Sequence, residues 1–302
     1  MKKLTNKYLN SSRWMPYLLI APTLVLIFAF LFYPVLNVFR YSTMHYNLAK
    51  PKLTEFIGLG NFKEIFTDDK IFAGSLWVSV KWVVMTVSFQ IIIGMIISLA
   101  LNRNFRGQGL VRTILVSPWA FSGVLVSTLW ILLTHQNMGF INNLMVDLGI
   151  WETGVAFTGN PKTVFATVVS AAVWRGVPFF VIIFLASLQN IPLEIYDSAK
   201  VDGANGFQFF WKIILPFLKQ TVIFSSLLRI IWEYNNIDLI YVITKGGPMN
   251  MTLTLAMYTI NTAIKQGNYG YGSTLNVISF LFMLIFMLIY LGLSKKYARE
   301  EL

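Results

Sequence analysis

Three charged side chains, Arg175, Arg229 and Glu233, lie within stretches of sequence that are otherwise strongly apolar. Arg229 and Glu233 are four residues apart and Asn236 follows three residues later, so on a helix these three side chains share one face. A charge in a lipid-embedded segment is costly unless it faces a partner or a water-filled cavity. These residues therefore predict a polar site inside a bundle of apolar helices.

The chemistry of this polar face allows two interpretations. In the first, Glu233 forms a structural ion pair with Arg229 or Arg175 that neutralises charge inside the bundle. In the second, the face lines a water-accessible cavity near the middle of the membrane, where a hydrophilic solute binds. Arg, Glu and Asn beside Trp and Phe can hydrogen-bond to sugar hydroxyls and stack on sugar rings. Two Arg against one Glu would also suit an acidic solute, although Asp238 offsets that balance.

The residue patterns that commonly mark an enzyme or a metal centre are missing from the sequence. It contains no Cys, and its two His residues, His45 and His135, fall in predicted loops. It has no Ser/His/Asp arrangement and no phosphate-binding loop of the Gly-x-x-x-x-Gly-Lys-Ser/Thr type. We therefore expect no catalytic residue, no metal site and no cofactor in this chain. ATP-driven activity would need a separate ATPase.

The elements that must position these residues are membrane-spanning helices. Of the 302 residues, 56% are hydrophobic and 12% are charged, about half the charged fraction of a typical soluble domain. A helix needs about 20 apolar residues to cross the hydrocarbon core. Runs of that length predict six spans, at residues 17–40, 74–101, 111–134, 163–189, 213–243 and 273–293. Gly176 and Pro178 favour a break in the fourth span, and the polar residues of the fifth favour a bend or contact with water.

The distribution of basic residues predicts the orientation of the chain. Lys and Arg concentrate at the N-terminus, after the second and fourth spans, and at the C-terminus. With six spans these segments lie on one side, which the positive-inside rule identifies as the cytoplasm. The net charge of +11 is therefore a topology signal and does not indicate nucleic-acid binding. We predict an all-α polytopic membrane protein with both termini cytoplasmic. For the 41–73 loop, an outer cap and an amphipathic segment both remain open.

A polar segment between the fourth and fifth spans carries its own helix start and stop signals. Pro192 stands where a helix can begin, and Glu194 and Asp197 place negative charge near its positive end. Gly203 can end the helix in a left-handed conformation. We expect a short cytoplasmic helix over about 192–204 that another protein holds.

This segment resembles a known family. The run from Glu194 to Ala204 (EIYDSAKVDGA), followed by IILP at 213–216, is similar to the "EAA" signature of permease subunits in binding-protein-dependent ABC importers. Asp197 stands where the family usually has Glu, and Ser198 where it often has Ala. The runs WRGVPF at 174–179 and IYVITKGGP at 240–248 resemble the carbohydrate branch, and within it the maltose-type first permease subunit.

The resemblance implies a type I ABC importer permease fold with a cytoplasmic coupling helix. It implies one membrane domain over 1–302, with an N-terminal span and outer loop at 1–72, a permease core at 73–293 and a cytoplasmic tail at 294–302. The implied partners are a second homologous permease, an ATPase dimer that binds ATP and Mg, an extracytoplasmic solute-binding protein, a saccharide and the lipid bilayer. The implied location is the bacterial inner membrane, with multiple spans.

The resemblance also implies roles for particular residues. The positions that match the ATPase-coupling helix are Glu194, Asp197, Ser198, Ala199, Asp202 and Gly203. The positions that match sugar contacts in the maltose-type pocket are Trp119, Gly123, Arg175, Gly176, Phe179, Arg229, Glu233 and Asn236. Arg175, Arg229 and Glu233 depart from the neutral maltose pocket, so the saccharide could be neutral or acidic.

The leading hypothesis is therefore the permease subunit of an ATP-driven saccharide importer. The alternative is a self-sufficient secondary carrier with Glu233 as its titratable coupling residue. Such carriers often contain inverted repeats, and the sequence shows no convincing one. A membrane-embedded transferase or protease is a third hypothesis, for which the sequence supplies no recognisable nucleophile or metal set.

Overall fold

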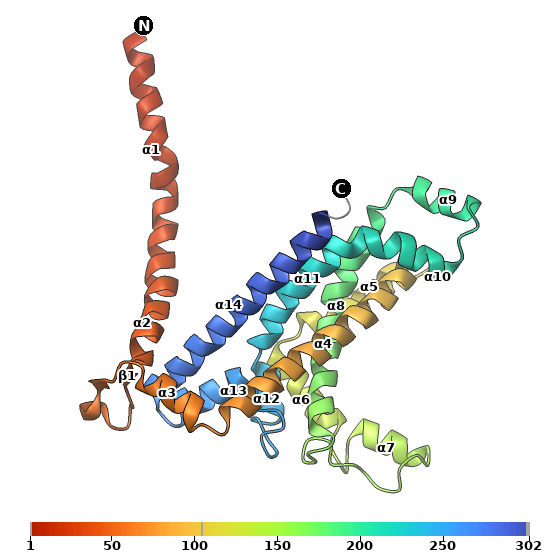
Figure 1. Cartoon of the computed structure of the whole chain (residues 1–302). Helices are drawn as coiled ribbons and strands as arrows, with labels where there is room; N and C mark the ends of the chain where they lie inside the picture. Colours follow the sequence, from red (N-terminus) through yellow and green to blue (C-terminus); the bar gives the residue numbers. More distant parts are fainter. Residues whose placement is uncertain (1, 104, 300–302) are drawn as a thin grey trace. The chain divides into compact units, whose positions relative to one another are not determined.

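The structure is a computed structural model that describes residues 2–103 and 105–299, with side chains for 15–103 and 105–294. The chain is mostly helical and divides into two compact units (Figure 1). The first comprises the chain up to Asp69 together with Thr259–Phe280, and the second comprises Lys70–Tyr258 and the chain from Leu281 onward. A single membrane domain over the whole chain stays a prediction.

The first unit joins a long helical segment to a small ordered loop region. Its elements are α1 (Lys2–Ile27), the π-helical turn η1 (Phe28–Phe32), α2 (Tyr33–Ser42), β1 (Met44–His45), the 3-10 turn η2 (Pro51–Leu53), β2 (Glu55–Phe56), α3 (Gly60–Thr67), the π-helical turn η4 (Asn261–Lys265) and the start of α14 (Tyr269–Arg299). β1 and β2 pair antiparallel, with Met44 opposite Phe56. The Asn61 amide donates to the carbonyl of Ser42 at 3.1 Å, and the Tyr271 hydroxyl donates to Asp69 at 2.7 Å. The 41–73 loop is therefore a folded region.

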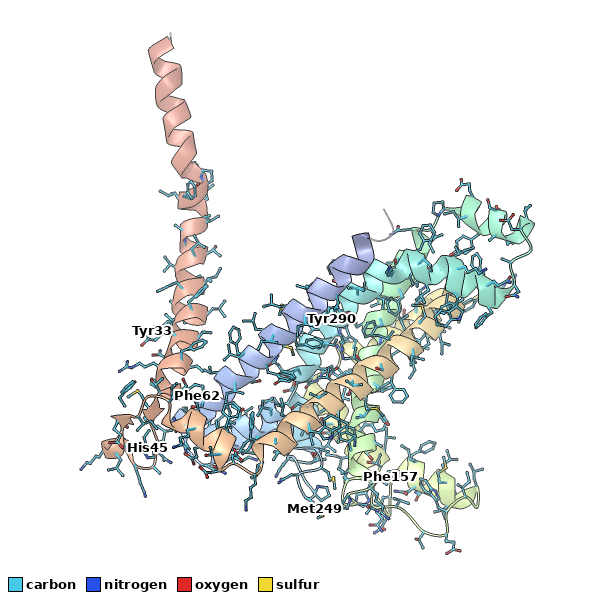
Figure 2. All side chains as sticks on the ribbon, in the orientation of Figure 1. Tyr33, His45, Phe62, Phe157, Met249 and Tyr290 are labelled. Atoms are coloured by element: carbon cyan, nitrogen blue, oxygen red, sulfur yellow. The ribbon has the colours of Figure 1, made fainter. Side chains whose placement is uncertain are left out.

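The second unit contains most of the predicted spans. Its elements are α4 (Phe72–Leu101), α5 (Gln108–Ala120), α6 (Gly123–Leu133), α7 (Phe140–Asp147), α8 (Val164–Gln189), α9 (Leu193–Val201), α10 (Gly206–Phe209), the π-helical turn η3 (Phe210–Ile214), α11 (Leu215–Tyr234), α12 (Asp238–Ile243), most of α13 (Leu255–Ile260) and the later part of α14. α4 packs along α8, and α11 packs against both. Tyr290 on α14 is labelled in Figure 2, and its hydroxyl contacts the Ser226 hydroxyl on α11 at 2.8 Å.

Five helices in the described part of the chain are long and apolar enough to cross a membrane. They are Met15–Ser42, Phe72–Leu101, Val164–Gln189, Gly206–Ile243 and Tyr269–Ser294. These helices confirm the first, second, fourth, fifth and sixth predicted spans. The fifth is interrupted at residues 235–237, between α11 and α12, and Asn235 is exposed there. This interruption agrees with the bend or water contact expected from its polar residues.

The third predicted span, 111–134, is corrected by the structure. In place of one helix, α5 and α6 meet at an angle of 102°. Pro118 in the last turn of α5 supplies no backbone N–H, and Phe121 then adopts an extended conformation. The Ser122 hydroxyl caps α6 by accepting from the backbone N–H of Leu125 at 3.3 Å. Hydropathy alone could not show this break, because the residues on both sides of it are apolar.

The predicted break in the fourth span is wrong. α8 runs from Val164 to Gln189 through Gly176 and Pro178, both of which are buried. Packing against α4, α5 and α11 encloses the helix on several sides. In such surroundings a membrane helix tolerates a proline, since neighbouring groups compensate for the missing backbone hydrogen bond. α8 therefore holds Arg175 on a continuous helix.

Candidate functional site

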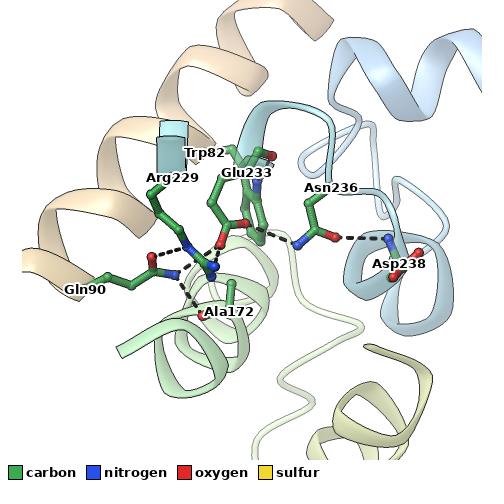
Figure 3. Close-up of polar contacts among 7 residues, drawn as sticks. All are labelled: Trp82, Gln90, Ala172, Arg229, Glu233, Asn236 and Asp238. Carbon is green, nitrogen blue, oxygen red and sulfur yellow. Dashed lines mark hydrogen bonds and ion pairs between the residues drawn. The ribbon is translucent and has the colours of Figure 1, made fainter. Parts of the chain in front are cut away.

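A buried polar cluster joins the three central helices of the second unit (Figure 3). Arg229 Nη2 lies 2.5 Å from Glu233 Oε1, one helical turn away on α11. Gln90 on α4 donates from Nε2 to Glu233 Oε1 at 3.1 Å and to the Ala172 carbonyl of α8 at 2.9 Å. Its Oε1 accepts from Arg229 Nε at 2.8 Å. We call Gln90, Arg229 and Glu233 the polar lock, because their side chains tie α4, α8 and α11 together.

The polar lock is shielded from solvent and its groups are well paired. Gln90 is 0% exposed, Glu233 1% and Arg229 8%. The second carboxylate oxygen of Glu233 accepts from Asn236 Nδ2 at 3.2 Å, and its backbone carbonyl accepts from Trp82 Nε1 at 3.0 Å. The structural ion pair allowed by the sequence is therefore present between Glu233 and Arg229. Arg175 takes no part in it.

A cavity of about 420 Å³ lies beside the polar lock, entirely within the second unit. Its lining residues are Trp119, Arg175, Arg229, Ile231, Trp232, Glu233, Asn235, Asn236, Ile237 and Asp238. This volume is within the range of small-molecule sites, and the lining combines aromatic faces with a few polar groups, as such sites do. The ion pair and the cavity, treated as alternatives at the sequence level, are thus both present and adjacent.

Two charged groups at the cavity are distinct from the polar lock. Arg175 on α8 is half-buried and Asp238 at the start of α12 is exposed. Both approach Gly123, the first residue of α6. A Cβ atom placed on Gly123 would lie 2.7 Å from Asp238 Cβ and 3.1 Å from Arg175 Nη1. A residue with a side chain at position 123 would therefore force these groups away from the cavity wall.

Gly176 and Phe179 stand behind the cavity wall and do not line it. A Cβ atom on Gly176 would overlap Gln90 Nε2 and Arg229 Nη2. The Phe179 ring lies 5.7 Å from the Arg229 guanidinium and packs edge-to-face on Trp232, with 5.4 Å between ring centroids. Both residues therefore support groups that do line the cavity.

The predicted pocket residues are thus brought together in one region. The predicted residues that line the cavity are Trp119, Arg175, Arg229, Glu233 and Asn236, and Gly123 adjoins it. Sequence reasoning missed Gln90, Trp82 and Trp232, and considered Asp238 only for charge balance. The available signal was Gln90 itself, an amide in the middle of a long apolar run.

The predicted coupling helix is present as α9, at the opposite end of α8 from α7 (Figure 1). Pro192 precedes its first residue, and Gly203 follows it with a left-handed φ of +72°, as its stop signal predicted. The exposed coupling positions are Glu194, Asp197, Ser198, Asp202 and Gly203. Ala199 is 5% exposed and belongs to the packing face. Asp197 has Lys200 at 3.3 Å as an exposed partner.

Among the described residues, no group of three or more His, Asp or Glu side chains could hold a metal ion. The cavity lining offers hydrogen-bonding, charged and aromatic groups.

Comparison with known proteins gives consistent matches over most of the chain. Residues 90–299 match the family model described as "Binding-protein-dependent transport system inner membrane component". The chain is 32% identical to the trehalose/maltose transport system permease protein MalF of Thermococcus litoralis, over 97% of each chain. It is 31% identical to the sulfoquinovosyl glycerol transport system permease protein SmoG of Agrobacterium fabrum, over 94% of this chain and 91% of that one.

A solved structure shares the fold. A chain of a bacterial ABC transporter involved in the import of the acidic polysaccharide alginate superposes with a TM-score of 0.83, covering 96% of this chain and 99% of that one. The two sequences are 20% identical. This similarity confirms the expected ABC importer permease fold.

Proposed function

Because this chain belongs to the family of binding-protein-dependent transport system inner membrane components, we propose that it translocates a saccharide as one permease subunit of an ATP-driven ABC importer. The observation that carries the proposal is the cavity among the central helices, with guanidinium, carboxylate and amide groups beside two Trp side chains. Sugar hydroxyls both donate and accept hydrogen bonds, so they suit such mixed polar groups. Relatives named for trehalose/maltose and sulfoquinovosyl glycerol support this substrate class.

The ATPase in this proposal is a separate subunit dimer that binds ATP and Mg. The sequence contains no phosphate-binding loop of its own. Glu194 and Asp197 on α9, and Asp202 directly after it, are exposed, and these carboxylates suit basic groups in a cleft of the ATPase. Ser198 and Gly203 are also exposed, and their small size permits close approach by a partner.

A continuous set of contacts connects α9 to the cavity. The Tyr196 ring on α9 packs against Phe209 of α10, with 5.1 Å between centroids. α10 continues through η3 into α11, the helix that carries Arg229 and Glu233. Movement of α9 by a closing ATPase would therefore act on the helix that forms one wall of the cavity. This connection supports a mechanism in which ATP-driven closure changes access to the bound saccharide.

The other proposed partners follow from the family. A second homologous permease would complete the translocation pathway, and an extracytoplasmic solute-binding protein would deliver the saccharide. A solved structure of the alginate transporter, also similar in fold, is described as a complex with a periplasmic protein, which supports the second of these partners. We place the chain in the bacterial inner membrane, with its N- and C-termini in the cytoplasm. The secondary-carrier alternative is not supported, because the family depends on binding proteins.

The proposal is tested by co-expressing the tagged chain with its neighbouring operon products and purifying it in detergent. We expect a second permease and an ATPase to remain bound. In proteoliposomes supplied with the solute-binding protein, saccharide uptake should require ATP, and an ATPase variant without its phosphate-loop Lys should abolish it. Uptake by this chain without any ATPase subunit would contradict the proposal.

A further inference from the structure

The four charged side chains at the cavity fall into two pairs with different surroundings. Arg229 and Glu233 satisfy each other and Gln90 inside the polar lock. Arg175 and Asp238 line the same cavity, yet within residues 15–103 and 105–294 neither side chain makes a hydrogen bond or an ion pair. The groups left to bind a cargo by charge are therefore the Arg175 guanidinium and the Asp238 carboxylate.

The backbone of Asp238 is anchored at the start of α12. Its N–H donates to Asn236 Oδ1 at 3.2 Å, and the Nδ2 of the same amide donates to Glu233 Oε2 (Figure 3). Asn236 thus links the polar lock to the start of α12. Gly123 leaves the space that Arg175 and Asp238 share at the wall. This network fixes the backbone from which the unpaired carboxylate projects at the cavity wall.

The two unpaired groups carry opposite charges that sum to zero. A hydroxyl donates to a carboxylate and accepts from a guanidinium, so neighbouring hydroxyls of a neutral saccharide satisfy both groups together. Trp119 and Trp232, each 48% exposed, supply faces for a sugar ring. An acidic saccharide would pair with Arg175 but would bring its charge near Asp238, and repulsion of this kind discriminates against a wrong ligand.

We propose that Arg175 and Asp238 form the selectivity pair of the cavity, that Asp238 restricts the cargo to neutral saccharides, and that Glu233 is a structural residue. This inference rests on the proposed transport function. It separates residues that contact the cargo from residues that hold the helices, a distinction that the sequence left open.

The test measures binding by the permease complex itself, because the solute-binding protein has its own selectivity. The complete complex of permeases and ATPase is trapped with a non-hydrolysable ATP analogue. Binding is then measured for trehalose, maltose and cellobiose and for the uronate counterpart of each. Wild type should bind at least one neutral sugar about tenfold or more tightly than its uronate, and Asp238→Asn should reduce that ratio about tenfold. Arg175→Gln should weaken binding of the uronate further.

Matched controls separate this selectivity from assembly. Asp147→Asn, the same exchange on the exposed α7 helix, should leave the ratio unchanged. Glu233→Gln should lower the yield or melting temperature of the complex. A stable Glu233→Gln complex with an altered ratio would overturn its structural role. Three outcomes would overturn the proposed selectivity pair. They are a wild type that prefers uronates, an unchanged affinity ratio in Asp238→Asn, and an intact complex that binds no neutral sugar. Failure of any ATPase to co-purify would instead refute the proposed function.

Discussion

At Gly176 the absence of a side chain makes room for two polar groups from other helices. The Gln90 amide and the Arg229 guanidinium occupy the space that a Cβ atom would fill. Position 176 therefore decides whether the hydrogen bonds of the polar lock can form. A buried polar group that loses its partner costs about 1–3 kcal/mol, so small displacements here have large effects.

We expect Gly176→Ala to destabilise the second unit by about 1–3 kcal/mol, because the new methyl group separates Gln90 from Arg229. Thermal unfolding of the purified complex in detergent measures the change. Gly74→Ala on α4 is the matched control, since nothing lies within 4 Å of a Cβ atom there. Gly74 lies in the first turn of α4, where that exchange should be neutral or stabilising by less than about 1 kcal/mol. Equal melting temperatures for the two variants would contradict the role of Gly176.

The residue scale also shows which contacts a sequence can predict. Arg229 and Glu233 are four residues apart on one helix, so their ion pair follows from local geometry. Gln90 is 139 residues from Arg229, and its contact depends on how α4 packs against α11. One amide in an apolar run indicates a buried partner but does not identify it.

At the scale of elements, local signals decided which predictions succeeded. α9 was placed correctly because Pro192 and Gly203 act through the backbone of their own segment. The break between α5 and α6 also has local signals, Pro118 and Ser122. Hydropathy does not reveal this break, because the residues on both sides of it are apolar. In α8 the error was the opposite, because Pro178 predicted a break that the structure does not contain. There, burial by neighbouring helices outweighs the local cost of a proline.

α9 leads to a prediction about coupling. Asp197→Lys reverses the charge of an exposed position whose described partner is Lys200, in a surface pair that contributes little to stability. Membrane insertion should therefore persist, while ATP-dependent uptake falls at least about tenfold or the ATPase no longer co-purifies. Asp147→Lys, the same exchange on α7 at the other end of α8, should retain uptake. Normal uptake by Asp197→Lys would exclude a docking role for this carboxylate.

At the scale of the whole molecule, the topology depends on the bent pair α5–α6. Within the described residues, five single helices are long and apolar enough to span the membrane, and the pair supplies a sixth crossing only if it passes from one side to the other. In the second unit α9 and α7 lie at opposite ends of α8 (Figure 1). α5 follows the end of α4 after a short loop, whereas α6 leads within a few residues into α7. α4 and α8 run parallel, because Lys81 lies against Phe165, Gln90 against Ala172 and Gly94 against Phe180. The bent pair must therefore return the chain from the end of α4 to the start of α8, which supports six crossings.

The natural absence of Cys makes this topology directly measurable. We expect Asn143→Cys on α7 to react with a membrane-impermeant maleimide in intact cells, and Ser198→Cys on α9 to react only after the membrane is opened, because both positions are exposed at opposite ends of the second unit. If the bent pair were a re-entrant loop, each position after it would change sides and the two labelling results would be exchanged. Thr54→Cys precedes the pair and should label from outside in either case, so it reports whether the reagent reaches the outer surface. Because α9 must face the cytoplasm to meet an ATPase, the exchanged pattern would contradict both the six-span topology and the proposed coupling.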